Sequence, residues 1–424
     1  MIGCHRKAET GRSVPIQWIL LAALILRLGW AIITPAQPVS DFAEYDQVAR
    51  NLISGHGYSR IPDQPTAYRP PAYPFFLAGI YSISAGSILV ARLANAVLGT
   101  LAVLFSYLLA CQTFSKKVAA WAATIHAFTP SLILYSGLLA SENVAIPLLL
   151  ASMICALRGL VRNHPGWLAT SGLLLGWTCL ARSLFILLPV TWMIWALLRK
   201  VALRKIVAAA IWVAVGIVVA LLPWIIRNAL TFGRFIPLAT NSGSMLVYNF
   251  NPAIQRRVAP GEQIPGLAEI DAQGLDEPHL DAARRNLAIE FIRQNPFEVV
   301  RMIPYKLFYL YRDDVSGVVW SDTNPERPLP PAIRWGLIAL AQGYYIVLML
   351  LSLVAVIQYR KLPGDRRWIF IALPILYVTF FHTIFFGDDR YHLTVLPFLA
   401  IFAGFQASQW WEQITSKADQ AALA

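Results

Sequence analysis

The chain has 424 residues, of which 57% are hydrophobic and 14% are charged, and its mean hydropathy is +0.55. Soluble domains carry about 25% charged residues, and a signal peptide would supply only one apolar run. The net charge of +12 would favour nucleic-acid binding in a soluble protein, but here the positive residues lie between apolar runs, as the positive-inside rule requires. The composition therefore indicates a multi-spanning membrane protein and no nucleic-acid partner.

Apolar runs of roughly 17–25 residues, the length that crosses a bilayer as a helix, recur along the whole chain. Ten transmembrane helices are expected, over residues 15–34, 88–114, 118–135, 144–160, 166–180, 184–198, 206–226, 335–357, 368–386 and 391–410. The shorter apolar piece 70–85 opens with two prolines and is expected to lie at the outer interface. These runs predict an all-α bundle.

Basic residues follow every second run, which sets the expected orientation. They are Arg6 and Lys7, Lys116 and Lys117, Arg158 and Arg162, Arg199–Lys205, and Arg360–Arg367. Under the positive-inside rule these segments face the cytoplasm, as do both termini. The protein is expected in the plasma (inner) membrane.

Two long polar segments, 35–69 and 228–332, then fall on the outer face. Three regions are expected: an N-terminal bundle over 1–227 that includes the first outer loop, an extracytoplasmic loop domain over 228–332, and C-terminal transmembrane helices with a short cytoplasmic tail over 333–424. A loop as long as the second one usually has a function.

The first outer loop contains the stretch SDFAEYDQVARNLISGHGY, residues 40–58. Asp41 and Glu44 are three positions apart and share a face if the stretch is helical. Its apolar residues recur at helical spacing, which predicts a helix lying on the membrane surface. Asp41 is then a candidate general base or metal ligand at the mouth of a membrane cavity. The alternative is that Asp41 caps this helix while Glu44 favours its dipole.

Further charged residues lie at the outer ends of the apolar runs. Glu142 stands in a short hairpin, where it is either functional or merely solvated. Arginines at the outer face run against the inward charge bias: Arg69, Arg182, Arg227 and Arg390. Because arginine binds phosphate through paired donors, they indicate an anionic ligand, although each one could instead snorkel to lipid headgroups. An ion pair within Asp388–Arg390 is the simpler explanation of the charged turn there.

The segment that follows the seventh run is rich in amides. Asn241, Asn249 and Asn251 suit sugar hydroxyls, and they equally suit ordinary turns. Four cysteines, Cys4, Cys111, Cys155 and Cys179, show no paired spacing, which argues against a disulfide framework or a zinc site.

Taken in order, these segments resemble a known class. The quoted stretch 40–58 is followed by YRPPAYPFFLAGIY (68–81), SEN (141–143), ARS (181–183), RNALTFGRFIPLATNSG (227–243) and RYHLTVLPFLA (390–400). Together they resemble the GT-C membrane glycosyltransferases that use polyprenyl-phosphate-linked sugars, within them glycosyltransferase family 39. That family includes the bacterial relatives of protein O-mannosyltransferases and of the lipid A aminoarabinose transferase. The likeness covers nearly the whole chain.

The resemblance implies a hexosyl- or pentosyltransferase and a role for each candidate residue. Asp41 matches the first-loop aspartate taken as the base for the acceptor hydroxyl, with Glu44 beside it, and Glu142 matches a second acidic position. Arg182, with Arg69 and Arg390, would hold the donor phosphate, and displacement would invert the anomeric carbon. The acceptor would be a lipid, glycan or protein on the extracytoplasmic face.

Two positions depart from the pattern of relatives. Asp41 is followed by Phe42 rather than by a second acid, and Arg182 is followed by Ser183 rather than by proline. The need for a divalent metal stays open. Two other functions stay open as well: a transporter or flippase of a polyprenyl-linked or lipid substrate, which usually has polar residues at mid-membrane, and a non-catalytic membrane scaffold.

Overall fold

The computed structural model describes residues 15–251, 264–359 and 367–423 and is a bundle of helices. Within those ranges the strands are β1 (Ser59–Ile61) and β2 (Gln64–Pro65), which form one short antiparallel pair. The all-α fold class is confirmed. The expected basic residues Arg6 and Lys7 and those over 360–366, together with Cys4, lie outside the described residues.

Helices stand at all ten predicted positions. Six are individually long and apolar enough to cross a membrane: α1 (Ile16–Ile33), α4 (Ile88–Thr113), α7 (Glu142–Arg162), α10 (Leu203–Phe232), α16 (Pro331–Tyr359) and α17 (Arg367–Ile384). The third predicted span is instead a bent pair. Here α5 (Lys116–Phe128) meets α6 (Pro130–Leu134) and η1 (Tyr135–Gly137) at 59°. Pro130 explains the break, because it disfavours helical backbone at Thr129 and removes an amide donor.

The remaining predicted spans are shorter or interrupted. They are α8 (Pro165–Ala181), η2 (Ser183–Leu187) with α9 (Leu188–Leu198), and α18 (Asp389–His392) with α19 (Leu396–Leu423). The helix α8 packs closely on α10. The backbones are so near at Gly172 that a Cβ on this residue would overlap the carbonyl oxygen of Val213. Small residues allow such close backbone approach between membrane helices.

Two shorter helices, α2 (Asp41–Ile53) and α3 (Ala72–Ser84), precede α4 and pack on each other. The predicted helix in the first outer loop is therefore present. Its apolar face points into the protein, however: Phe42, Tyr45 and Val48 are each less than 5% exposed. The apolar face of α2 is therefore covered by protein, through α3 and its aromatic residues; that the helix lies at the membrane surface stays a prediction. Tyr45 and Tyr73 meet edge to face at 5.4 Å.

The segment between α10 and α16 contains five helices: α11 (Ser242–Asn249), α12 (Leu267–Asp271), α13 (Glu277–Gln294), α14 (Pro296–Tyr311) and α15 (Ser316–Ser321). A small apolar cluster that includes Val247, Ala288 and Met302 holds α11, α13 and α14 together. Glu277 joins this segment to the first loop, because its Oε1 accepts from the backbone N–H of Ala67 at 2.7 Å.

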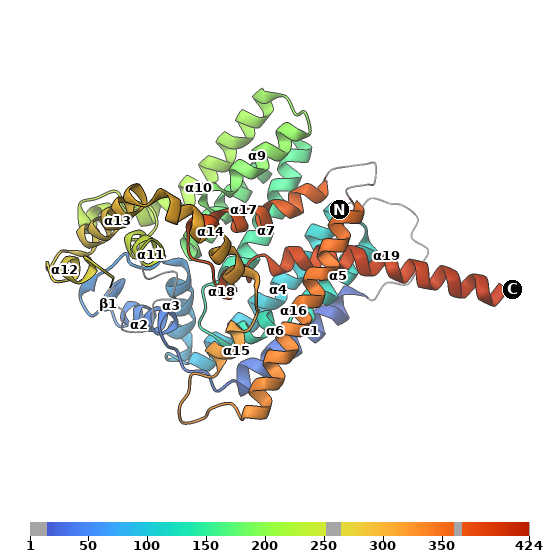
Figure 1. Cartoon of the computed structure of the whole chain (residues 1–424), viewed down its shortest axis with the longest axis horizontal. Coiled ribbons are helices and arrows are strands. Elements are labelled where there is room, and N and C mark those ends of the chain that lie inside the picture. Colours follow the sequence, from blue (N-terminus) through green and yellow to red (C-terminus); the bar gives the residue numbers. More distant parts are fainter. Residues whose placement is uncertain (1–14, 252–263, 360–366, 424) are drawn as a thin grey trace.

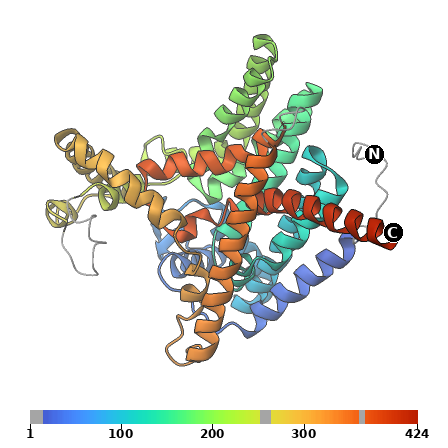
Figure 2. The same cartoon turned by 45° about the vertical axis from the view of Figure 1, so that its right-hand side comes forward.

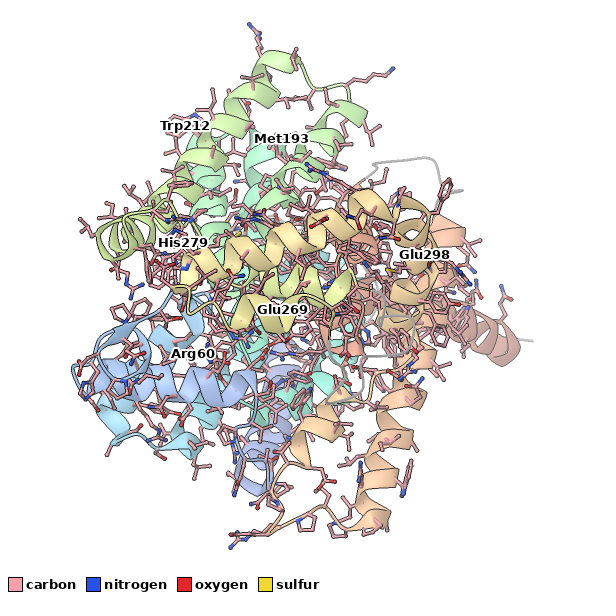
Figure 3. The ribbon with its side chains drawn as sticks, turned by 60° about the vertical axis from the view of Figure 1, so that its left-hand side comes forward. Arg60, Met193, Trp212, Glu269, His279 and Glu298 are labelled. Atoms are coloured by element: carbon pink, nitrogen blue, oxygen red, sulfur yellow. The ribbon has the colours of Figure 1, made fainter. Side chains whose placement is uncertain are left out.

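The helices of the two polar segments gather at one side of the bundle. Figure 1 shows α2, α3 and β1 in blue beside α11, α12 and α13 in yellow, with α19 extending to the opposite side. Turning the molecule shows α13 projecting away from the long helices (Figure 2). Figure 3 shows His279 and Glu269 in this region, with Met193 on α9 and Trp212 on α10 beyond.

Candidate active site

Asp41 is the first residue of α2 and binds two arginines. Its Oδ1 accepts from Arg69 Nη2 at 2.7 Å, and its Oδ2 accepts from Arg390 Nη1 at 3.0 Å. The residue before it, Ser40, occupies the N-cap position, and no side-chain hydrogen bond caps the helix. The capping interpretation of Asp41 is therefore wrong, since both of its oxygens face guanidinium groups contributed by distant parts of the chain.

Glu44 lies one turn further along α2, on the same face as predicted. Its Oε2 accepts from Arg69 Nε at 2.5 Å, and Arg60 Nη2 lies 3.4 Å from its Oε1. Arg69 thus binds both Asp41 and Glu44, which fixes the N-terminal turn of α2 against the segment that leads into α3. Paired guanidinium donors suit this geometry because the fork is planar and rigid.

Glu142 is the first residue of α7 and is 1% exposed. Its Oε1 accepts from Arg182 Nη1 at 2.7 Å and from Arg390 Nε at 2.6 Å. The interpretation of Glu142 as a solvated interfacial acid is therefore wrong. A buried carboxylate is tolerated only when it is paired and hydrogen-bonded, and two arginines meet that requirement here.

Arg390 connects the two acidic positions. It donates to Asp41 on one side and to Glu142 on the other, and its guanidinium lies over the Phe42 ring at 4.8 Å. The turn that carries it is fixed by Asp389, whose Oδ2 accepts from the backbone N–H groups of Val315 and Ser316. Arg390 therefore pairs across the bundle, and the expected ion pair within its own turn is wrong.

A cavity of about 240 Å³ opens beside these charged groups. One wall carries Asp41, Arg69, Arg182 and Arg390, and the other is largely apolar. The full lining is Asp41, Tyr45, Arg69, Pro70, Ser141, Ala181, Arg182, Ser183, Leu184, Asn241, Ser242, Met245, Phe381, His382, Phe385, Phe386, Arg390 and Tyr391. An anionic group with an apolar chain attached would suit both walls.

Of the three asparagines in the amide-rich segment after α10, one lines the cavity. Asn241 lines the cavity, whereas Asn249 and Asn251 do not. The amide of Asn249 donates to Met245 O and that of Asn251 to Val247 O, so both satisfy the backbone of their own helix turn. The amide nitrogens of both residues thus bond within their own helix turn, whereas Asn249 Oδ1 is buried with no partner among the described residues.

Arg227 also differs from the expectation that it faces an anion. Its guanidinium donates to the carbonyl oxygens of Thr66 at 2.7 Å and Tyr58 at 3.1 Å. It therefore ties the residues on either side of the β1–β2 hairpin to α10, away from the lining of the cavity. Its role is structural.

The charge balance of the site holds Asp41 ionised. Burial alone would raise the pKa of Asp41, but the neighbouring guanidinium groups of Arg390 and Arg69 outweigh this effect, and the pKa lies below its ordinary value of 3.8. Within the described residues, no group of three or more His, Cys, Asp or Glu side chains is arranged to hold a metal ion. The cations beside the carboxylates are guanidinium groups.

Sequence reasoning missed His382 and Tyr391 as lining residues. His382 lies within the apolar run that forms α17, and Tyr391 stacks on it with ring centroids 4.8 Å apart. The available signal was a histidine inside a membrane span, since ionisable residues there are rare and usually functional.

Comparison with solved structures identifies the fold. The archaeal oligosaccharyltransferase AglB from Archaeoglobus fulgidus, in complex with an inhibitory peptide and a dolichol-phosphate, is 14% identical with a TM-score of 0.56. Its apo form is 15% identical with a TM-score of 0.57. Both alignments cover 96% of this chain and 52% of that one, so the chain spans about half the length of AglB. ArnT from Cupriavidus metallidurans bound to undecaprenyl phosphate is 13% identical over 93% of this chain and 78% of that chain, with a TM-score of 0.44.

The likeness to AglB defines the class of protein: the chain has the fold of the GT-C membrane glycosyltransferases, and the resemblance predicted from its sequence is confirmed at that level. More particularly, residues 68–226 match the profile of the family described as dolichyl-phosphate-mannose-protein mannosyltransferase. That segment contains Arg69, Glu142 and Arg182. No protein with a curated description matches the chain.

Proposed function

We propose that the protein transfers a sugar from a polyprenyl-phosphate donor to a hydroxyl of a lipid, glycan or protein acceptor. One observation carries the proposal: Arg390 joins the Asp41 carboxylate to the Glu142–Arg182 pair at the wall of a cavity whose other side is apolar. A general base, cationic groups for a phosphate and an apolar surface for a lipid are the three components that this chemistry needs.

The reaction assigns each component a step. Asp41 takes the proton of the acceptor hydroxyl, and that oxygen attacks the anomeric carbon of the donor. The bond between the anomeric carbon and the phosphate oxygen breaks, and its electron pair stays on the phosphate. Arg182 and Arg390, with Arg69 beside them, stabilise the negative charge on the departing polyprenyl phosphate. Direct displacement inverts the anomeric configuration.

Donor binding would also make Asp41 a stronger base. In the free protein Arg69 and Arg390 hold the pKa of Asp41 down after burial has raised it. A phosphate that binds to the same guanidinium groups brings negative charge close to Asp41, and a nearby like charge raises the pKa of a carboxyl group. The base would therefore become effective when the donor is present.

The apolar wall suits the lipid portion of the donor. Phe381, Phe385 and Phe386 line it, and all three belong to the end of α17 and the turn that follows. AglB in its complex carries a dolichol-phosphate, which is the same chemical kind as the lipid phosphate of the donor proposed here. We assign the general base, Arg69 and Arg182 to the N-terminal bundle (residues 1–227) with its outer loop 35–69, and Arg390 to the C-terminal helices (residues 333–424). Acceptor-side contacts are assigned to Asn241 in the loop domain (residues 228–332), on the extracytoplasmic face of the plasma membrane.

The test compares wild type with Asp41→Asn and Asp46→Asn in proteoliposomes. Asp46 lies on the same helix, but its carboxylate pairs with Arg50 at 2.8 Å and does not line the cavity, so it is a matched control. Each protein receives a panel of radiolabelled polyprenyl-phosphate sugars and a crude extract of lipid and glycan acceptors.

Label should move to an acceptor with wild type and with Asp46→Asn, and the rate should fall by about 10²–10⁴-fold with Asp41→Asn. Equal transfer by all three proteins would remove Asp41 as the base. Failure of wild type to transfer label from any donor, while the label crosses the bilayer, would replace the transferase with a flippase.

A further inference from the structure

Two polar atoms in the cavity lining are buried and unpaired. Ser183 Oγ and His382 Nε2 have no hydrogen-bond partner among the described residues, and both residues line the cavity. His382 is 3% exposed. A buried polar atom without a partner costs free energy that a ligand hydrogen bond recovers, so their occurrence together in one cavity points to a ligand.

The local geometry fixes the hydrogen-bonding character of His382. Its Nδ1 lies 2.5 Å from Phe386 O, and because a carbonyl oxygen only accepts, Nδ1 carries a proton. In the neutral imidazole Nε2 is then an acceptor. His382 therefore presents an acceptor, and the Ser183 hydroxyl can donate or accept.

Both residues adjoin the arginine assigned to the phosphate. Ser183 follows Arg182 in the chain. The guanidinium of Arg182 lies 5.3 Å from the Tyr391 ring centroid, and the His382 ring lies 4.8 Å from that same centroid. Arg182 and His382 are thus at most about 10 Å apart, which is close enough for a sugar joined directly to an Arg182-bound phosphate to meet them. Asp41 lines the same cavity and binds Arg390.

We propose that Ser183 and His382 form a hydroxyl-recognition subsite for the donor sugar. The inference rests on the proposed function and specifies two residues that recognise its donor. The unprotonated Nε2 of His382 accepts from a sugar hydroxyl, and the Ser183 hydroxyl can donate to or accept from another.

The experiment measures equilibrium dissociation constants of the full-length chain in nanodiscs for undecaprenyl phosphate alone and for undecaprenyl phosphate carrying mannose, glucose, galactose, arabinose or glucuronate. Wild type, Ser183→Ala, His382→Phe and His382→Gln are compared. Ser321→Ala is the matched control, because Ser321 is buried outside the cavity lining and its hydroxyl donates to Gly317 O at 2.7 Å. Binding of undecaprenyl phosphate alone reports that each variant is folded.

Wild type should bind the best of these sugar lipids about tenfold or more tighter than the bare lipid. Ser183→Ala and His382→Phe should lose that gain and keep the affinity for the bare lipid. His382→Gln should restore some of it because its amide oxygen accepts, and Ser321→Ala should behave as wild type.

If Ser183→Ala and His382→Phe both still bind the sugar-carrying lipid more tightly than the bare lipid, by as much as wild type does, the subsite is wrong. Wild type binding the bare lipid without any gain from a sugar would sink this inference alone, whereas wild type binding no undecaprenyl lipid would remove the proposed function together with it.

Discussion

Glu142 Oε1 lies 2.6 Å from Arg390 Nε, although the two residues are 248 positions apart in the chain. The same oxygen accepts from Arg182 at 2.7 Å. One buried carboxylate oxygen thus fixes two of the arginines that line the cavity. The orientation of both arginines therefore depends on Glu142.

Replacing Glu142 should destabilise the protein strongly. Glu142→Gln removes the counter-ion of Arg182 and one of the two counter-ions of the buried Arg390, and breaking a buried ion pair typically costs about 3–5 kcal/mol. We expect a clearly lower melting temperature of the purified chain, measured by thermal unfolding in detergent. Glu412→Gln is the control, because Glu412 forms an exposed pair with Lys117 at 3.1 Å and such pairs contribute little. Equal melting temperatures for wild type and Glu142→Gln would contradict the structural role given to Glu142.

Arg390→Lys should weaken donor binding although it keeps the charge. The guanidinium of Arg390 reaches Asp41 and Glu142 at once, and a lysine ammonium cannot reproduce that planar fork. We expect the dissociation constant for undecaprenyl phosphate to rise by about tenfold. Arg227→Lys is the control, since Arg227 binds backbone carbonyls outside the cavity lining. If Arg227→Lys weakens binding as much as Arg390→Lys, the arginine assignment is wrong.

The sequence predicted the helical class and most of the charged site residues because each has a local signal. Apolar length marks the spans, acids stand out at their outer ends, and arginines there run against the inward charge bias. Pairing has no local signal: nothing near Glu142 in the chain indicates that it binds Arg182 and Arg390. The buried apolar face of α2 was missed for the same reason, since periodicity shows that a helix has an apolar face but not whether lipid or protein covers it.

The cavity lining was the least predictable feature. Asn249 and Asn251 have the composition of sugar-binding residues, yet their amides are used by nearby carbonyl groups, and such use depends on where a helix ends. His382 was hidden in an apolar run, although its polarity there was a usable signal. Pro130 was likewise a readable sign of the bend in the third span.

The stability of the ligand-free protein should depend on Asp41 at acid pH. Because the pKa of Asp41 lies below its ordinary value of 3.8 in the folded state, the ionised side chain stabilises the fold above pH 3.8. That contribution is lost as the pH falls through the folded-state pKa. The melting temperatures of wild type and Asp41→Asn should differ by a constant amount from pH 5 to 7 and converge below pH 3.8. A difference that instead grows from pH 5 to pH 8 would mean that the pKa is raised.

The close contact between α8 and α10 should not tolerate a side chain at Gly172. A Cβ there would overlap the Val213 carbonyl oxygen, and backbone of a packed helix cannot move aside as a flexible side chain can. Gly172→Ala should therefore destabilise the protein by about 1–3 kcal/mol or more, despite the better helix propensity of alanine. Gly343→Ala in α16 is the matched control. A Cβ at Gly343 would have no described atom within 4 Å except those of its chain neighbours and of the nearby backbone of its own helix. Gly343→Ala should melt at the same temperature as wild type or higher. Since α8 ends at Ala181, directly before Arg182 and Ser183, Gly172→Ala should also weaken binding of undecaprenyl phosphate, and unchanged stability and binding would show that the two helices are not packed through this glycine.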